Sequence, residues 1–320
     1  MHTLITFASA PGPHCKEALA DLKLPNLARL LQLLTPGAQL HGQANDLTPI
    51  HERVLAQAAG LSGPDGLVPW AAHEAQRLGH TALHGTSGWA WITPCHWKPQ
   101  SNQVDMTDPL HMAITPKDAD ALFTAMQPYF AEDGITLFAP TQDHPSTRWL
   151  AHGAVFVDLP TASLDRVAGQ SVDAWMPRTA QAQALRRLQN EMQMLLYTHP
   201  VNDQRTHQRL PIVNAFWASG TGTLSQPMDT PTRADVYCLR DALRAPALQD
   251  DAAAWAMAWH ALDASTLAHD VQRLQLGESV AITLCSATQA LTLEKKPLGM
   301  LERMRRRVAP LQPNDLLKTL

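Results

Sequence analysis

The chain is rich in residues that can bind metal ions or transfer protons, with 15 histidines and four cysteines. No histidine pair has the HExxH spacing of a metalloprotease helix. His84, Cys95 and His96 could approach one another across a hairpin, but a zinc site would need a further ligand at workable spacing, and none is visible. We therefore expect structural or surface histidines here, and we predict neither a bound metal nor a cofactor.

A polar segment over residues 199–222, HPVNDQRTHQRLPIVNAFWASGTG, carries the groups best suited to binding an anion. An asparagine side chain offers both a donor and an acceptor, and an arginine offers a planar fork that matches carboxylate or phosphate. The glycines near its end let backbone N–H groups turn toward a ligand. The predicted ligand-binding residues are Asn202, Arg205, Asn214, Ser219, Gly220 and Gly222.

The same residues have a structural alternative. Asn202 and Asn214 could satisfy local backbone groups, and Arg205 could pair with a nearby acid. The Ser219–Gly222 stretch is more often a plain tight turn after a strand than an anion nest. From the residues alone, the binding and structural interpretations of the asparagines and the arginine are equally good.

The segment resembles the pattern HPxNxxRxxxxLPxxNxxWxxGxG, which is typical of RpfE-type regulatory proteins and, more distantly, of archaeal-type cofactor-independent phosphoglycerate mutases. Weaker similarity to the RpfE-type group extends over about residues 100–300. The matching stretches outside the central segment are Asp108-Pro109, Gly134–Ala139, Arg148–Ala151, Asp173–Pro177, Leu188–Met194 and Ala261–Ala264. The resemblance implies an alkaline-phosphatase-like core in degenerate form.

The mutases of this superfamily carry a metal-binding Asp just after the first strand, a nucleophilic Ser and later Asp/His clusters for two metal ions. Here the first strand ends in Ala8-Ser9-Ala10, and Asp143-His144 is the sole Asp-His dipeptide. The resemblance therefore favours a non-catalytic or degenerate regulatory protein that senses a phosphorylated or carboxylated metabolite. The alternatives are an active mutase-like enzyme and a protein-interaction module with a surface formed by Trp217, Trp255 and Trp259.

Composition and charge exclude other classes of protein. The formal net charge is -4 and the pI is about 6.4, whereas a nucleic-acid-binding protein usually shows a basic domain or stripe. The four cysteines are scattered, which is typical of a reducing compartment. The N-terminus lacks the pattern of a secretory signal, and no apolar run approaches the length of a membrane helix. We expect a cytoplasmic protein without nucleic-acid or membrane partners.

The elements that must position these residues follow from periodicity. Residues 180–197 form the clearest amphipathic helix, with one apolar stripe at Leu185, Leu188, Met192 and Leu196. Thr115-Pro116-Lys117-Asp118 predicts a capped helix start. Residues 215–218 predict a short strand before the glycines, and 280–284 and 290–294 predict a hairpin. A closing helix is expected over residues 298–308.

Strands alternate with helices, which predicts an α/β fold with a mixed sheet and flanking helices. We expect a mostly helical N-terminal region over residues 1–90 that contributes one strand to the core. Residues 91–320 are expected to form the α/β core that carries the polar segment.

Overall fold

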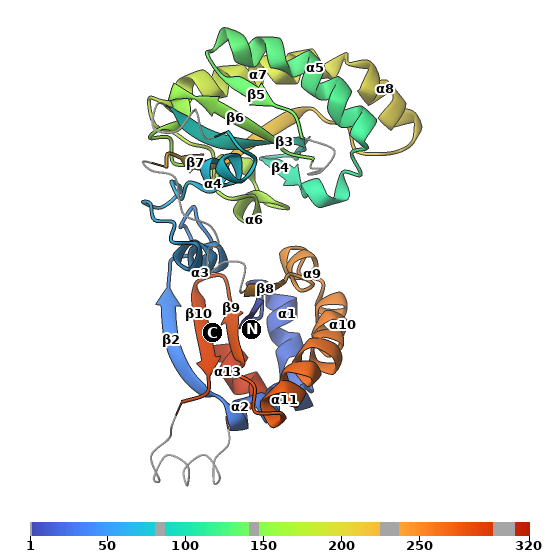
Figure 1. The fold of residues 1–320 in the computed structure, drawn as a ribbon. Coiled ribbons are helices and arrows are strands. Elements are labelled where there is room, and N and C mark those ends of the chain that lie inside the picture. Colours follow the sequence, from blue (N-terminus) through green and yellow to red (C-terminus); the bar gives the residue numbers. More distant parts are fainter. Residues whose placement is uncertain (1, 81–86, 141–146, 225–236, 297–310) are drawn as a thin grey trace. The chain divides into compact units, whose positions relative to one another are not determined.

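The computed structural model describes residues 2–80, 87–140, 147–224, 237–296 and 311–320, in two compact units (Figure 1). The terminal unit comprises Met1–Asn45, Pro49–Gly60 and Pro231–Leu320, and the central unit comprises Asp46–Thr48 and Leu61–Thr230. These boundaries differ from the expected division between residues 90 and 91. The reason is strand pairing, since the first strand joins strands from the last third of the chain.

The terminal unit is built on a five-stranded mixed sheet in the order β2-β10-β9-β1-β8. Its strands are β1 (His2–Ile5), β2 (Thr35–His41), β8 (Tyr237–Arg240), β9 (Ala281–Cys285) and β10 (Gln289–Glu294). Strand β1 runs parallel to β8 and β9, and β10 runs antiparallel to β9 and β2. The predicted hairpin is confirmed as β9 and β10, and the mixed sheet with flanking helices is confirmed as the fold class.

Helices cover both faces of this sheet. They are α1 (Pro13–Ala18), α2 (Pro25–Leu33), α3 (Ile50–Ala59), α9 (Arg244–Leu248), α10 (Ala252–Leu262), α11 (Ala268–Gln275) and α13 (Pro313–Thr319). The larger core joins α1, α2, α10, α11 and α13 to the sheet face that carries Ile5 and Ile282. Helix α3 packs on the opposite face, against Leu4 and Ala290. The expected helix over residues 298–308 lies outside the described residues.

Helix α10 holds the N-terminal elements of this unit in place. Before it, the Asp250 carboxylate accepts hydrogen bonds from the backbone N–H groups of His14 and Cys15, at the start of α1. After it, Asp263 accepts from the backbone N–H groups of Asn26 and Leu27, at the start of α2. The two carboxylates therefore satisfy helix N-termini that are more than 200 residues away in sequence, and their negative charge suits the positive end of each helix dipole.

The central unit contains an antiparallel sheet in the order β4-β3-β6-β5, and β7 also pairs with β3, over its residues Trp89 to Cys95. Its strands are β3 (Gly88–Pro99), β4 (Val104–Thr107), β5 (Thr136–Phe138), β6 (Trp149–Gly153) and β7 (Ala215–Gly222). Its helices are α4 (Trp70–Arg77), α5 (Pro116–Glu132), α6 (Leu164–Val167), α7 (Ala182–Tyr197) and α8 (Pro200–His207).

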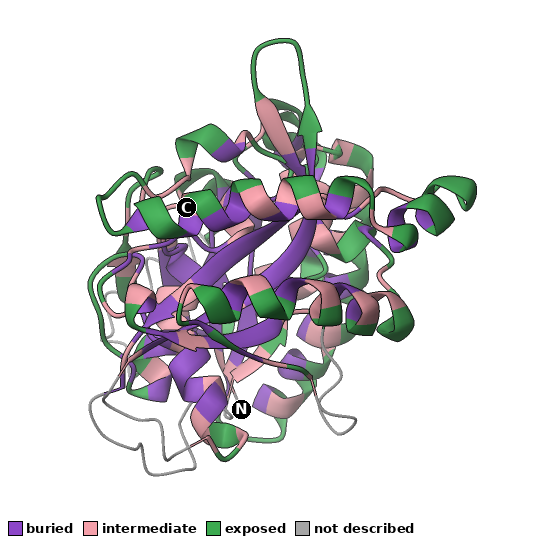
Figure 2. Cartoon of the chain, turned by 90° about the horizontal axis from the view of Figure 1, so that it is seen from above, coloured by how far each residue is buried: buried purple, intermediate pink, exposed green. Residues whose placement is uncertain are grey.

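The hydrophobic core of the central unit lies between its sheet and the helices α5 and α7. The predicted cap of α5 is confirmed, because Thr115 and Asp118 form a reciprocal capping box. Buried residues line the strands, whereas the outward faces of the helices are exposed (Figure 2). Among the described residues, no helix combines the length and the apolar character that crossing a bilayer requires.

The apolar stripe of α7 generates a stability prediction. Leu188 is fully buried in the central core, whereas Met194 on the same helix is 79% exposed. Leu188→Ala should lower the free energy of unfolding by about 2–5 kcal/mol, because it removes buried methyl groups and leaves a cavity. Urea denaturation measures this change.

The matched control is Met194→Ala, which should change the free energy of unfolding by less than about 0.5 kcal/mol. Equal effects of the two substitutions would contradict the placement of the stripe.

Candidate functional site

The polar segment over residues 199–222 folds into a short helix and a strand. Asn202 and Arg205 lie within α8, which begins at Pro200 and is capped by the His199 side chain. Asn214 precedes β7, and Ser219, Gly220 and Gly222 lie inside β7. The strand thus runs four residues further than expected, and the glycines form no separate turn.

Asn202 is buried and hydrogen-bonds the chain on both sides of its helix. Its amide nitrogen donates to the carbonyl groups of Leu196 and Val213, both at 2.7 Å. Its amide oxygen accepts from the N–H of Val213 at 2.8 Å. These bonds join the end of α7 to the approach of β7, and they use the donor and acceptor capacity of the side chain.

Arg205 is 1% exposed, and its guanidinium group is surrounded by acceptors. Nε donates to the carbonyl of Pro211 at 2.8 Å, and Nη1 donates to the Asp118 carboxylate at 3.0 Å. Nη1 also donates to the carbonyl of Ala113, and Nη2 donates to the carbonyl of Met112. This arrangement is the buried ion pair with additional hydrogen bonds that lets a charge stay inside a protein.

Asn214 bonds the backbone of the neighbouring strand β3. Its side-chain oxygen accepts from the N–H of Trp97 at 2.7 Å, and its side-chain nitrogen donates to the carbonyl of Trp97 at 2.9 Å. This pair of bonds extends the pairing of β3 with β7 by one residue beyond the last ladder pair, Cys95 with Ala215.

The two glycines of β7 are required by their conformation and by close packing. Gly220 has φ 63°, and a Cβ there would lie 2.7 Å from Cε3 of Trp91. Gly222 has φ 136°, and a Cβ there would lie 2.9 Å from the carbonyl oxygen of Leu67. Both positions therefore favour glycine for steric reasons.

The predicted ligand-binding residues thus have separate sets of partners. Asn202 bonds residues of α7 and the β7 approach, Arg205 bonds the start of α5, and Asn214 bonds β3. The structural alternative is confirmed for all three, since the asparagines satisfy backbone groups and the arginine pairs with an acid. Their polar side-chain atoms bond three different parts of the central unit rather than one another.

The carboxyl end of β1 is the second place to examine, because α/β proteins bind ligands outside the carboxyl ends of parallel strands. Phe7 has φ 54°, an uncommon conformation for a residue with a side chain. Trp255 and Trp259 donate their indole N–H groups to the carbonyl groups of Phe7 and Ala8, both at 3.2 Å. The chain that leaves β1 is therefore fixed by two buried indoles from α10.

Next to this exit, β8 ends in a partly buried arginine. The carbonyl of Arg240 accepts from the N–H of Thr6, which places β8 beside β1. Among the described residues, Nε of Arg240 is buried and has no hydrogen-bond partner. Asp270 is buried in the same unit, accepts from the hydroxyl of Thr3 at 2.8 Å and interacts electrostatically with Arg240. Burial is the largest effect on Asp270 and raises the pKa of its carboxyl, whereas the charge of Arg240 lowers that pKa.

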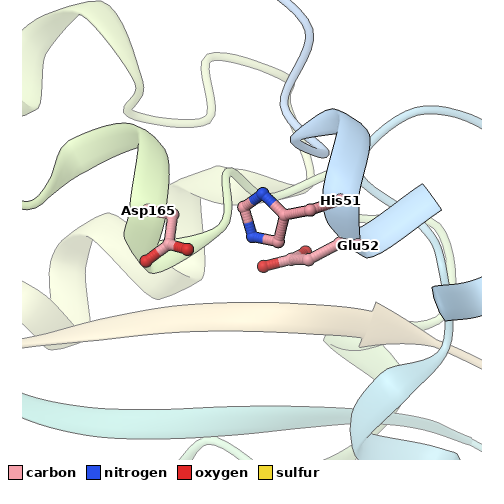
Figure 3. Close-up of side chains that lie close together, drawn as sticks. All are labelled: His51, Glu52 and Asp165. Carbon is pink, nitrogen blue, oxygen red and sulfur yellow. The ribbon is translucent and has the colours of Figure 1, made fainter. Parts of the chain in front are cut away.

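The side chains considered above as potential metal ligands are His84, Cys95 and His96. Cys95 lies in β3, where burial raises the pKa of its thiol, and burial lowers the pKa of His96. His84 lies outside the described residues. His51 and Glu52 are adjacent on α3 of the terminal unit, whereas Asp165 lies on α6 of the central unit (Figure 3). Because these three side chains are divided between the two units, we do not assign a metal site to them.

The alternative prediction of a protein-interaction surface formed by three tryptophans is wrong, because none of the three is exposed. Trp217, Trp255 and Trp259 are each at most 1% exposed. Trp217 donates its indole N–H to the carbonyl of Ala162 at 2.9 Å, as the other two do at the β1 exit. Aromatic residues are common at interfaces, but here all three side chains are buried and their N–H groups bond backbone carbonyls.

The contacts of Arg205 generate a second prediction. Arg205→Met should lower the free energy of unfolding by about 3–5 kcal/mol, because it leaves Asp118 and several carbonyl groups without their buried partner. Chemical denaturation of the full chain measures this loss.

Arg187→Met is the matched control, since Arg187 pairs with Asp133 and Glu191 but is 61% exposed. That change should cost less than about 1 kcal/mol. A small effect of Arg205→Met would revive the ligand-binding interpretation of this residue.

No protein-family model matches the chain, and no curated protein matches it. Among solved structures, it is similar to the cofactor-independent phosphoglycerate mutase from Thermoplasma acidophilum DSM 1728, at 12% identity and a TM-score of 0.37, over 100% of this chain and 98% of that chain. It is also similar to the PH0037 protein from Pyrococcus horikoshii, at 14% identity and a TM-score of 0.40, over 95% of this chain and 92% of that chain. These likenesses are distant, and the fold class rests on the sheets and helices described above.

Proposed function

We propose that this chain is a non-catalytic, phosphoglycerate mutase-like binding protein of the RpfE type, which recognises a phosphorylated or carboxylated metabolite. The proposal rests on the sequence resemblance and on the way the chain uses the residues where catalysis would be expected. A regulatory role follows from it, since a protein that binds a metabolite without converting it can report the concentration of that metabolite.

The exit of β1 is the observation that carries the proposal. A two-metal phosphoryl transfer needs hard, negatively charged ligands held close together. Residues 6–10 are Thr-Phe-Ala-Ser-Ala, which provide no carboxylate, and two buried indoles already bond the carbonyl groups of Phe7 and Ala8. These residues and contacts favour a structural role for the segment over metal coordination.

Arg240 supports the recognition of an anion. It ends β8 beside the β1 exit, and its Nε is a donor without a partner among the described residues. A buried, unpaired donor on a cation is costly unless a ligand satisfies it. A phosphate or carboxylate oxygen is the group that matches a guanidinium best.

The active mutase is the alternative, and a coupled assay distinguishes it. The purified chain should not interconvert 3- and 2-phosphoglycerate with added Mn²⁺, and elemental analysis should find no stoichiometric divalent metal. Turnover that a chelator abolishes, together with two metal ions per chain, would refute the non-catalytic proposal.

Anion recognition is tested by thermal shift with 3-phosphoglycerate as the probe. A ligand that binds the native state alone must raise the melting temperature, and Arg240→Gln should remove most of that rise by removing the charge. Arg29→Gln is the control, because Arg29 is exposed and bonds Gln32 on its own helix. A rise that survives Arg240→Gln would place the anion elsewhere, and no rise at millimolar 3-phosphoglycerate would count against this metabolite class.

A further inference from the structure

The terminal unit contains a cavity of about 300 Å³ on the sheet face opposite the Arg240 side chain. It is lined by residues of the strands β2, β8 and β10 and of the helix α3, which packs on this face of the sheet. Tyr237 and Arg240 are three residues apart in β8, so their side chains point to opposite faces of the sheet. The cavity is therefore separate from the anion site proposed above.

The lining carries neutral hydrogen-bonding groups. Gln39 and Gln57 are exposed and lie on two different elements of the lining, β2 and α3. Tyr237 is half-buried and contributes an aromatic ring, and burial raises the pKa of its hydroxyl, which keeps it protonated. Among the described residues, no hydrogen bond engages these three side chains, so each is available to a ligand.

A series of side-chain hydrogen bonds leads from the cavity to His2. Thr292, which lines it, bonds Thr283 at 2.8 Å, and Thr283 bonds Nε2 of His2 at 2.7 Å. The His2 ring stacks on Tyr237 with 4.1 Å between ring centroids. Burial is the largest effect that lowers the pKa of His2, to about 4, so the ring is neutral at pH 7.

A neutral imidazole can take either tautomer, and this property determines what Thr292 offers a ligand. When Nε2 of His2 carries the proton, it donates to Thr283, Thr283 donates to Thr292, and the Thr292 hydroxyl is free to donate to a ligand. When Nε2 of His2 accepts, Thr283 donates to it and Thr292 donates to Thr283, so that the Thr292 oxygen can only accept from a ligand. The floor of the cavity can therefore adapt to a donor or to an acceptor.

We propose that this cavity binds a neutral, planar, hydrogen-bonding ligand of nucleoside size. Its volume lies at the lower end of the range for small-molecule sites. Two amides match the alternating donors and acceptors of a nucleobase edge, and Tyr237 offers an aromatic surface. Among the described residues that line it, there is no lysine, arginine or histidine that would favour a phosphate.

The test is isothermal titration of the full chain with uridine and adenosine, each beside its 5′-monophosphate. At least one nucleoside should bind saturably at millimolar concentration or below, and its monophosphate should bind no more tightly. Thr292→Val should weaken binding about five- to tenfold by removing one hydrogen bond while keeping the shape. Ala58→Leu should abolish binding, because the larger side chain fills space at the lining position on α3.

Thr35→Val is the matched control, since Thr35 belongs to β2 but lies outside the lining, and it should leave binding unchanged. Absence of binding by both nucleosides would overturn the proposal. Binding that survives both Thr292→Val and Ala58→Leu would also overturn it, and tighter binding of a monophosphate would overturn the neutral class of ligand. None of these outcomes bears on the mutase assay, so the two proposals can fail separately.

Discussion

Four side chains in and beside α10 hold the N-terminal part of the terminal unit. Trp255, Trp259 and Asp263 are spaced four residues apart, so they lie on one face of the helical segment, and Asp250 precedes it. The two indoles bond the chain that leaves β1, and the two carboxylates bond the first backbone N–H groups of α1 and α2. A hairpin is held together by its short turn, but parallel strands are joined by long connections and have no such turn. In this unit, contacts from this face of α10 fix the chain that leaves β1 and the starts of α1 and α2.

The terminal unit is held together by contacts between segments from the two ends of the chain, which explains why the central unit can be inserted between them in the sequence. Strands β8 and β9 lie on either side of β1, so the terminal unit is complete only when residues from both ends of the chain have paired. The central unit has a sheet and a core of its own, and its antiparallel strands need no partner from the terminal unit. Insertion therefore interrupts the sequence of the terminal unit without interrupting its sheet.

Local features of this fold could be predicted from the sequence, and contacts between distant segments could not. The α7 stripe, the capping box at Thr115 and the β9–β10 hairpin depend on residues a few positions apart, and all three are confirmed. The N-terminal region was expected to supply one strand, but it supplies β1 and β2. Asp250 and Asp263 act on helices more than 200 residues away, and no local pattern marks an aspartate for that task.

The polar segment shows why residue type and spacing did not decide function. Arg205 and Asn202 have the chemistry of anion binding, but a side chain whose donors already bond buried carbonyls has little left for a ligand. The groups left without protein partners are more informative than the groups that match a pattern. Within the described residues, Nε of Arg240 is a buried group of this kind, and the amides of Gln39 and Gln57 at the β2–α3 cavity are exposed groups of this kind. Burial without a partner is costly for Nε of Arg240, whereas water can satisfy the exposed glutamines of the cavity, so the two proposed sites rest on different physical grounds.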